Sequence, residues 1–230
     1  MKKILTIAVA SLAIAAVADS YSPQIGVTKL SLSNKNNILP VQFTSLTNGN
    51  VTADALVCTN NIPEGSYLLA YIGNLDNPYS VWVLGSNGWV STDVVSVDGV
   101  SVTAGAANTE LAVGSAIWLS FSAKPASAIN VSVYGKVTTS PSVSIAAGTT
   151  SLVCNPTSSA KVPTLSGLPA YKDKVVVITD TNSGEYVYTG TKWLHRDTSG
   201  KVTDSELPEI PAHGGFWYIS NGGVSGTISW

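Results

Sequence analysis

Two histidines, the side chains best suited to acid–base chemistry near neutral pH, stand without a recognisable catalytic partner. His195 belongs to the tripeptide His195-Arg-Asp197, and His213 precedes a pair of glycines. A nucleophile and its general base must meet in space, and a tripeptide in a polar segment does not establish such a pair. The chain also has no Cys–His cluster with the spacing of zinc ligands. We therefore predict that both histidines are turn or surface residues.

Two short motifs match chemical signatures only in part. The run Ser158-Ser-Ala-Lys161 has the Ser-x-x-Lys spacing of serine acylases, but it lacks their Lys-Thr-Gly strand, so we interpret it as a linker. Asp180 and Asn182 have the spacing of the first two oxygen ligands of a calcium loop. The fifth position is a glycine, and Thr191 stands where a bidentate acid is needed. A hairpin turn explains this second segment better.

Aromatic side chains are the strongest candidates for contact with a ligand. Exposed Trp and Tyr side chains on a sheet can stack on sugar rings or form a subunit contact. The candidates are Trp82, Trp89, Tyr186, Tyr188, Trp193 and Trp217. The alternative is packing inside the protein. Phe216 and Tyr218 face away from Trp217 along a strand, so if one set is core, the other is exposed or lies at an interface.

Scattered acids offer one catalytic hypothesis, a glycoside hydrolase that would use Glu110 and Glu209. That chemistry needs two carboxylates about 5–9.5 Å apart. The two acids occupy equivalent positions of a repeated stretch, and equivalent positions in separate domains do not favour such convergence. We predict a non-enzymatic protein with no cofactor and no metal.

The stretch that contains these two acids occurs twice. Residues 110–121 reappear as residues 209–220, with the same spacing from the acid to Trp118 in one copy and to Trp217 in the other. Each copy has an acid, an apolar residue, a glycine turn, an aromatic strand and then a second strand. The repeat predicts one structural unit used twice, as β-repeat domains at residues 19–137 and 138–230.

The rest of each half consists of short runs with strand character. Residues 67–72 and 79–84 flank a turn rich in Gly and Asn, and residues 174–179 and 185–188 flank another. Asn-Gly and Ser-Gly between apolar runs are typical of hairpins, because Gly and Asn accept a positive φ. A turn or two of helix is expected only at residues 50–60. The predicted fold class is all-β, with two tandem β-sandwich or barrel-like repeats of short antiparallel strands.

Cys58 and Cys154 are the only cysteines. In an oxidising compartment an even pair tends to form a disulfide, which here would tie one repeat to the other. Free Cys is also among the most buried residue types, so two buried thiols fit the sequence equally well. Both alternatives stay open.

Residues 1–18 have the pattern of a secretory signal peptide. Lys2 and Lys3 precede an apolar run at residues 4–16, and Ala16-Val-Ala18 fits a cleavage site. The run is shorter than the roughly 20 residues of a membrane span, and no later segment is long and apolar enough, so no transmembrane span is expected in the mature chain. We expect export to the periplasm, the cell surface or the extracellular space.

Composition agrees with an exported β protein. Charged residues make up 11% of the chain, whereas ordinary domains have about 25%. Without Lys2 and Lys3, ten basic residues remain against 14 acidic ones, and the resulting net charge of −4 does not favour nucleic acid as a partner. Polysaccharide and self-association are the expected kinds of partner, because the aromatics suit the first and low charge with unpaired strand edges suits the second.

Four motifs stand out in the second half, at residues 135–138, 152–156, 190–193 and 211–218. They resemble the repeat motifs of an uncharacterised group of secreted tandem β-repeat proteins of Gram-negative bacteria. The first half matches through residues 26–28, 38–43, 88–89 and 114–119. Apart from this resemblance, a similar layout of strands and turns follows residues 26 and 135, so each repeat is expected to begin near Gly26 and near Gly135. The resemblance implies secretion and a β architecture, and it brings no known activity.

The sequence therefore predicts a secreted, non-enzymatic structural or adhesive β-repeat protein of the cell envelope or extracellular matrix. A carbohydrate-binding module that uses exposed aromatics is the alternative. An outer-membrane barrel fits less well, because strands of about 5–6 residues are shorter than the roughly 9–11 residues of a spanning strand. The glycoside hydrolase hypothesis fits less well for the reason given above.

Overall fold

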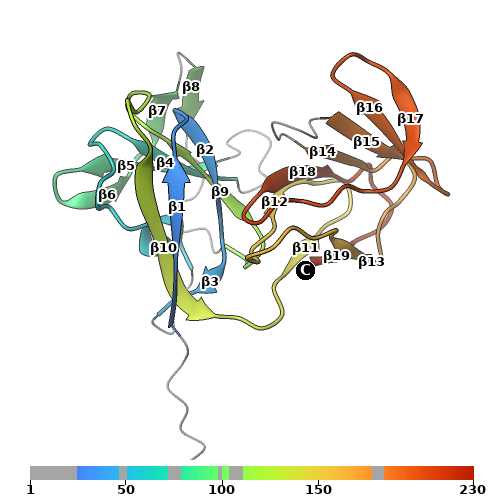
Figure 1. Ribbon diagram of the computed structural model, residues 1–230, viewed down its shortest axis with the longest axis horizontal. Helices are drawn as coiled ribbons and strands as arrows, with labels where there is room; N and C mark the ends of the chain where they lie inside the picture. The colour runs from blue at the N-terminus through green and yellow to red at the C-terminus, as the bar shows by residue number, and fades with distance from the viewer. Residues whose placement is uncertain (1–24, 47–50, 72–78, 98–99, 104–110, 178–183) are drawn as a thin grey trace, which may run out of the picture.

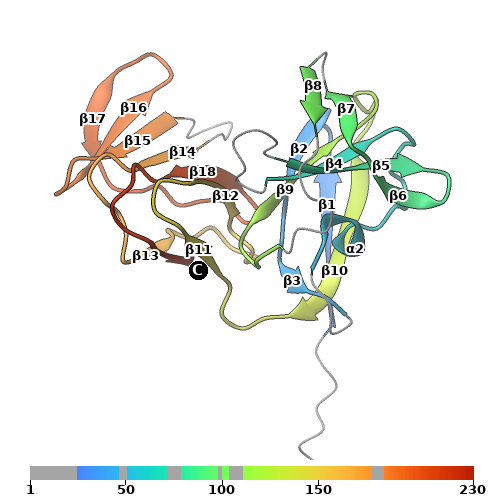
Figure 2. The same cartoon turned by 180° about the vertical axis from the view of Figure 1, so that it is seen from behind.

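The computed structural model describes residues 25–46, 51–71, 79–97, 100–103, 111–177 and 184–230. These residues form antiparallel strands and one short helix, so the predicted all-β class is confirmed. Figures 1 and 2 show two groups of strands side by side. Among the described residues no helix has the length and apolar character needed to cross a membrane. The predicted signal peptide lies outside them.

The first half contains two larger sheets and a hairpin. The sheets have the strand orders β1-β10-β3 and β2-β9-β4-β5-β6. Their strands are β1 (Ile25–Leu32), β2 (Asn36–Pro40), β3 (Phe43–Thr44), β4 (Tyr67–Tyr71), β5 (Tyr79–Gly85), β6 (Gly88–Ser91), β9 (Ala116–Ser120) and β10 (Ile129–Val137). The hairpin consists of β7 (Val94–Val97) and β8 (Val100–Thr103). The helix α2 (Ala53–Leu56) lies within the segment predicted to hold a turn or two of helix.

The second half contains two sheets of the same kind. Their strand orders are β11-β19-β13 and β12-β18-β14-β15-β16-β17. The strands are β11 (Ser142–Ile145), β12 (Thr150–Cys154), β13 (Thr164–Ser166), β14 (Lys174–Val177), β15 (Gly184–Tyr188), β16 (Trp193–Asp197), β17 (Val202–Ser205), β18 (Gly215–Ile219) and β19 (Gly226–Ser229). Strands that end at or before Val137 pair with one another, and strands that begin at or after Ser142 pair with one another. This change lies next to the predicted boundary between residues 137 and 138.

The two halves share one topology. In each half the first strand pairs with the last, β1 with β10 and β11 with β19. The second strand pairs with the one before the last, β2 with β9 and β12 with β18. Trp118 lies between Ile38 and Leu69 across its sheet, and Trp217 takes the same place between its own two neighbours. The predicted repeat is thus present in the strand pairing.

The predicted starting point of the second repeat is wrong. Gly26 and Gly135 are not equivalent, because they lie directly opposite each other on β1 and β10 of the first half. Both make room for Phe43, since a Cβ atom added to Gly135 would lie 2.6 Å from the Phe43 Cβ, and one added to Gly26 would overlap the Phe43 ring. The similar glycine motifs reflect this shared contact, and the strand equivalent to β1 is β11.

Each half has its own apolar core, with residues from both of its larger sheets. Leu39, Trp82, Ile117 and Val131 belong to the first core. The second core includes Val143, Val175, Phe216, Tyr218 and Ile228. Successive side chains of a strand point to opposite faces. The middle residue of β9 and of β18 therefore faces away from its own core.

These outward faces meet between the halves in an apolar group that we call the junction cluster. It consists of Ile38, Tyr71, Ala116, Trp118, Leu152, Cys154 and Trp217. The rings of Tyr71 and Trp217 meet edge to face, with centroids 5.0 Å apart and planes at 87°. The backbone N–H of Cys154 also donates to the carbonyl of Gly114 at 2.7 Å. The halves are joined by apolar burial and by backbone hydrogen bonds.

Candidate functional site

The six candidate aromatics do not form one exposed platform. Trp82 is 2% exposed in the first core, and Tyr186, 4% exposed, lies in the second core. Trp89 packs against the first core and donates its indole N–H to the carbonyl of Val57 at 3.0 Å. Trp217 lies in the junction cluster. Packing inside the protein accounts for these four residues.

Tyr188 and Trp193 pack in the second core and also border a surface groove of about 410 Å³, which we call the Trp193 groove. The two residues are cross-strand partners on β15 and β16, and their ring centroids are 5.3 Å apart. Trp193 is 9% exposed. The strand pairing therefore presents parts of two rings at one place on the surface.

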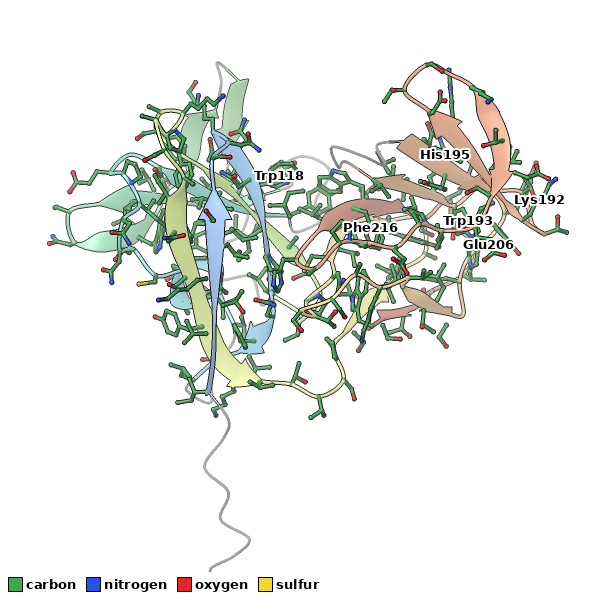
Figure 3. All side chains as sticks on the ribbon, viewed as in Figure 1. Trp118, Lys192, Trp193, His195, Glu206 and Phe216 are labelled. Atoms are coloured by element: carbon green, nitrogen blue, oxygen red, sulfur yellow. The ribbon has the colours of Figure 1, made fainter. Side chains whose placement is uncertain are left out.

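The remaining lining of the Trp193 groove divides into an apolar part and a polar part. Leu165, Leu168 and Leu207 are apolar, and Thr191, Lys192, Ser205 and Glu206 are polar or charged. Figure 3 shows Lys192, Trp193 and Glu206 close together on the second half. The Lys192 ammonium pairs with the Asp204 carboxylate at 2.5 Å. Aromatic and apolar walls with a few polar groups are typical of small-molecule sites, and 410 Å³ falls within their usual size range.

The predicted surface position of His195 is only partly right, because it lies in strand β16 and not in a turn. Its ring stacks on Tyr186, with centroids 4.4 Å apart and planes at 14°. At the end of this strand Asp197 accepts hydrogen bonds from the Ser199 hydroxyl at 2.6 Å and from the Lys201 N–H at 2.9 Å. These bonds, the Ser199 hydroxyl first, lower the pKa of the Asp197 carboxyl. The tripeptide thus ends a strand and stabilises a hairpin turn.

Two of the weighed hypotheses fall partly outside the described residues. Asp180 and Asn182 of the calcium-like segment lie there, and so does Glu110 of the glycosidase hypothesis. Glu209 is described and is exposed. Within the described ranges no group of three or more His, Cys, Asp or Glu residues is arranged to hold a metal ion.

The disulfide that the sequence allowed between Cys58 and Cys154 is not formed, and both residues are free thiols. Cys154 is fully buried, and its thiol donates to the carbonyl of Ser115 at 2.8 Å. Burial raises the pKa of this thiol strongly. Cys58 is only partly buried, and its backbone N–H donates to the carbonyl of Ser132 at 3.0 Å in the first half. The two thiols therefore lie in different local environments.

Residues of the Ser158–Lys161 run and the distant His213 line one cavity between the halves. Ser158, Lys161 and His213 surround it together with Gln42, and its volume is about 560 Å³. The predicted linker is more than a connection, because Lys161 exchanges backbone hydrogen bonds of 3.0 and 2.8 Å with Ile210. His213 does lie in a turn, as predicted. Gln42 carries no motif and was not identified from the sequence.

One signal for this cavity was present in the repeat. His213 and Gly114 are equivalent, since each donates its backbone N–H to the residue after the paired strand, Asn155 at 3.1 Å and Val41 at 2.8 Å. Both have a positive φ, 62° for His213 and 100° for Gly114. His213 thus adopts a backbone conformation that its sister copy gives to glycine, and this distinguishes it from an ordinary turn residue.

Comparisons of the chain with protein-family models, with curated proteins and with solved structures give no match. The class that the structure itself defines is an all-β protein built from two repeated antiparallel two-sheet units.

Proposed function

We propose that the protein is a non-enzymatic adhesive component of the cell envelope or extracellular matrix that binds polysaccharide through the Trp193 groove. The observation that carries the proposal is the meeting of Tyr188 and Trp193 with the polar groups Lys192 and Glu206 at one groove. The exposed parts of the Tyr188 and Trp193 rings contact the apolar face of a sugar ring, and the Glu206 carboxylate and the Lys192 ammonium bond its hydroxyls. The signal-peptide pattern and the low charge support a place outside the cytoplasm.

A purely structural role is the second candidate, and the junction cluster favours it. Four of the conspicuous aromatics serve packing, and Trp217 contributes to the contact between the halves. In this alternative the protein serves as a rigid structural element, and the Trp193 groove binds no ligand.

The test is a screen of the purified protein against an array of polysaccharides and oligosaccharides, followed by titration of each hit. Glu206→Gln and Lys192→Ala should each weaken binding about ten- to hundredfold, because a lost hydrogen bond to a charged group contributes roughly 1.5–3 kcal/mol. Lys124→Ala, at an exposed site of the first half, is the matched control and should bind as the wild type does. An array with no signal, or equal binding by all variants, would refute the adhesive proposal in favour of the structural one.

A further inference from the structure

The cavity between the halves, which we call the junction cavity, is separate from the Trp193 groove. Residues of both halves line it. Lys29 and Gln42 belong to the first half, and Lys161, His213 and Trp230 belong to the second. Its volume of about 560 Å³ is in the range of small-molecule sites. A molecule bound there would contact both halves at once.

Gln42 lies in the wall of the junction cavity. Its side chain lies more than nine-tenths buried, at 8% exposure. The Nε2 amide donates to the Pro156 carbonyl at 2.7 Å and lies 2.9 Å from His213 Nδ1. A carbonyl cannot donate, so the amide nitrogen must face Pro156 and the orientation of the amide is fixed. The Gln42 Oε1 is then a buried acceptor without a hydrogen-bond partner in the structure.

Trp230 lies in the same wall. Its indole Nε1–H is also buried without a hydrogen-bond partner, and the residue lines the same cavity. The ring is held by an edge contact with Phe216, with centroids 6.0 Å apart. Buried polar groups are nearly always hydrogen-bonded, and each exception calls for an explanation. Both atoms are fully covered, so a ligand in the cavity is bonded by other groups of the lining.

The charges of the lining residues limit the chemical class of ligand that the junction cavity can bind. Lys29 and Lys161 line the junction cavity, and none of the described residues that line it is an aspartate or a glutamate. Hydroxyl groups of Thr28, Thr157 and Ser158 add neutral polar contacts. The cavity therefore favours a negative group, and it offers no carboxylate for an ammonium group.

His213 contributes a further donor. Because Gln42 Nε2 is a donor at 2.9 Å, Nδ1 of His213 must accept, and the proton of the neutral ring resides on Nε2. Burial lowers the pKa of His213, which agrees with a neutral ring at pH 7.

We propose that the junction cavity binds an acidic sugar of the hexuronate type. Lys29 and Lys161 pair with its carboxylate, and the hydroxyl groups of Thr28, Thr157 and Ser158 bond its ring hydroxyls. Inorganic phosphate or sulfate does not fit as well, because so small an anion fills little of a cavity of about 560 Å³. A free amino acid does not fit, because its ammonium group finds no acidic partner. The proposal does not depend on the Trp193 groove.

Calorimetric titration of the purified protein tests this proposal. The probes are glucuronate and galacturonate, with glucose, galactose and inorganic phosphate as controls, and a short oligouronate separates a free sugar acid from the end of a polymer. The uronates should bind at least tenfold more tightly than the neutral sugars and phosphate. Equal binding of glucuronate and glucose, displacement by phosphate at equal concentration, or no binding of any uronate overturns the proposal.

Substitutions in the lining test whether uronate binds in the junction cavity. Lys29→Met and Lys161→Met should each reduce uronate affinity about tenfold or more, and Lys29 is exposed, so its replacement leaves the fold intact. Lys124→Met, at an exposed site away from the cavity, is the matched control. Glu206→Gln in the Trp193 groove should bind uronate as the wild type does, which separates this site from the proposed polysaccharide groove. Unchanged affinity in Lys29→Met and Lys161→Met shows that the cavity is not the site.

Discussion

Trp118 of β9 and Trp217 of β18 hold equivalent places in the two halves, and both side chains lie in the junction cluster. Each faces away from its own core because its neighbours on the strand face inward. The repeated aromatic strand thus performs two tasks, since one face completes a core and the other joins the halves. Trp217, a candidate ligand contact in the sequence, instead packs against the other half of the same protein.

Trp217→Ala should destabilise the protein by about 2 kcal/mol, less than for a fully buried tryptophan because Trp217 is half-buried. The change removes the edge contact with Tyr71 and leaves a gap in the junction cluster. Urea unfolding measures the loss. Tyr171→Ala is the control, since Tyr171 is 61% exposed and its replacement should change stability by about 0.5 kcal/mol or less. Equal effects of the two changes would contradict the role given to the cluster.

The two thiols should differ in reactivity. Cys58 is partly exposed, whereas Cys154 is buried and burial raises its pKa, so little reactive thiolate forms at Cys154 at pH 8. Labelling of the native protein with iodoacetamide should modify Cys58 alone, and labelling in urea should modify both. Cys58→Ser should abolish labelling of the native protein. Absence of any free thiol in urea would show that a disulfide had formed after all.

Tyr218→Phe should cost about 1.5–3 kcal/mol, the usual contribution of a hydrogen bond to a charged group. The Tyr218 hydroxyl donates to Asp173 at 2.7 Å, and this carboxylate is 0% exposed. Asp173 also accepts from the N–H groups of Ala170 and Asn221, at 2.8 Å each, and so holds the start of β14 near the end of β18. Urea unfolding again measures the change. Tyr171→Phe on the surface is the control and should be neutral.

The same tyrosine gives an alkaline dependence. Burial first, and then the hydrogen bond to Asp173, raise the pKa of Tyr218 above its ordinary value of about 10. The folded state thus favours the protonated phenol, and this stabilisation is complete below about pH 10 and is lost as the pH rises further. The difference in unfolding free energy between wild type and Tyr218→Phe should shrink above pH 10. A difference that is independent of pH would contradict the raised pKa.

His213 gives the opposite dependence. Burial lowers the pKa of its imidazole, so the folded state favours the neutral ring. Its stabilising contribution is present above the unfolded pKa of about 6.5 and is lost as the pH falls. Between pH 7.5 and 5.5 the wild type should lose more stability than His213→Asn, a variant that tolerates the positive φ but does not titrate. Parallel losses in urea unfolding would exclude this effect.

Local features of the fold could be predicted from the sequence because turn chemistry and side-chain alternation act over a few residues. The Asn87-Gly88 pair lies at the turn from β5 to β6, as the preference of Asn-Gly for hairpins predicts. Phe216 and Tyr218 face the core and Trp217 faces away, as the period of two requires. The repeat of the aromatic strand is recognisable because β9 and β18 need the same pattern.

Long-range features could not be predicted because no local pattern encodes them. Gly26 and Gly135 look equivalent in the sequence but are strand partners that both accommodate Phe43. The junction cavity collects Gln42, Lys161 and His213 from three segments that are distant in the sequence, and no sequence pattern connects these segments. Sequence patterns also do not reveal that the far side of a sheet is covered by the other half, which is what conceals Trp217.

Pairing of the first strand with the last has an evolutionary consequence. Ile25 at the start of β1 lies opposite Lys136 near the end of β10, and Ser142 at the start of β11 lies opposite Ser229 at the end of β19. Each unit therefore takes in and releases the chain at one point, and the four residues 138–141 suffice to connect the copies. A gene segment that encodes such a unit can be duplicated in tandem without threading the new chain through the old. By the same route such a protein can gain further whole units, and each added copy needs only one outer sheet face that packs against its neighbour.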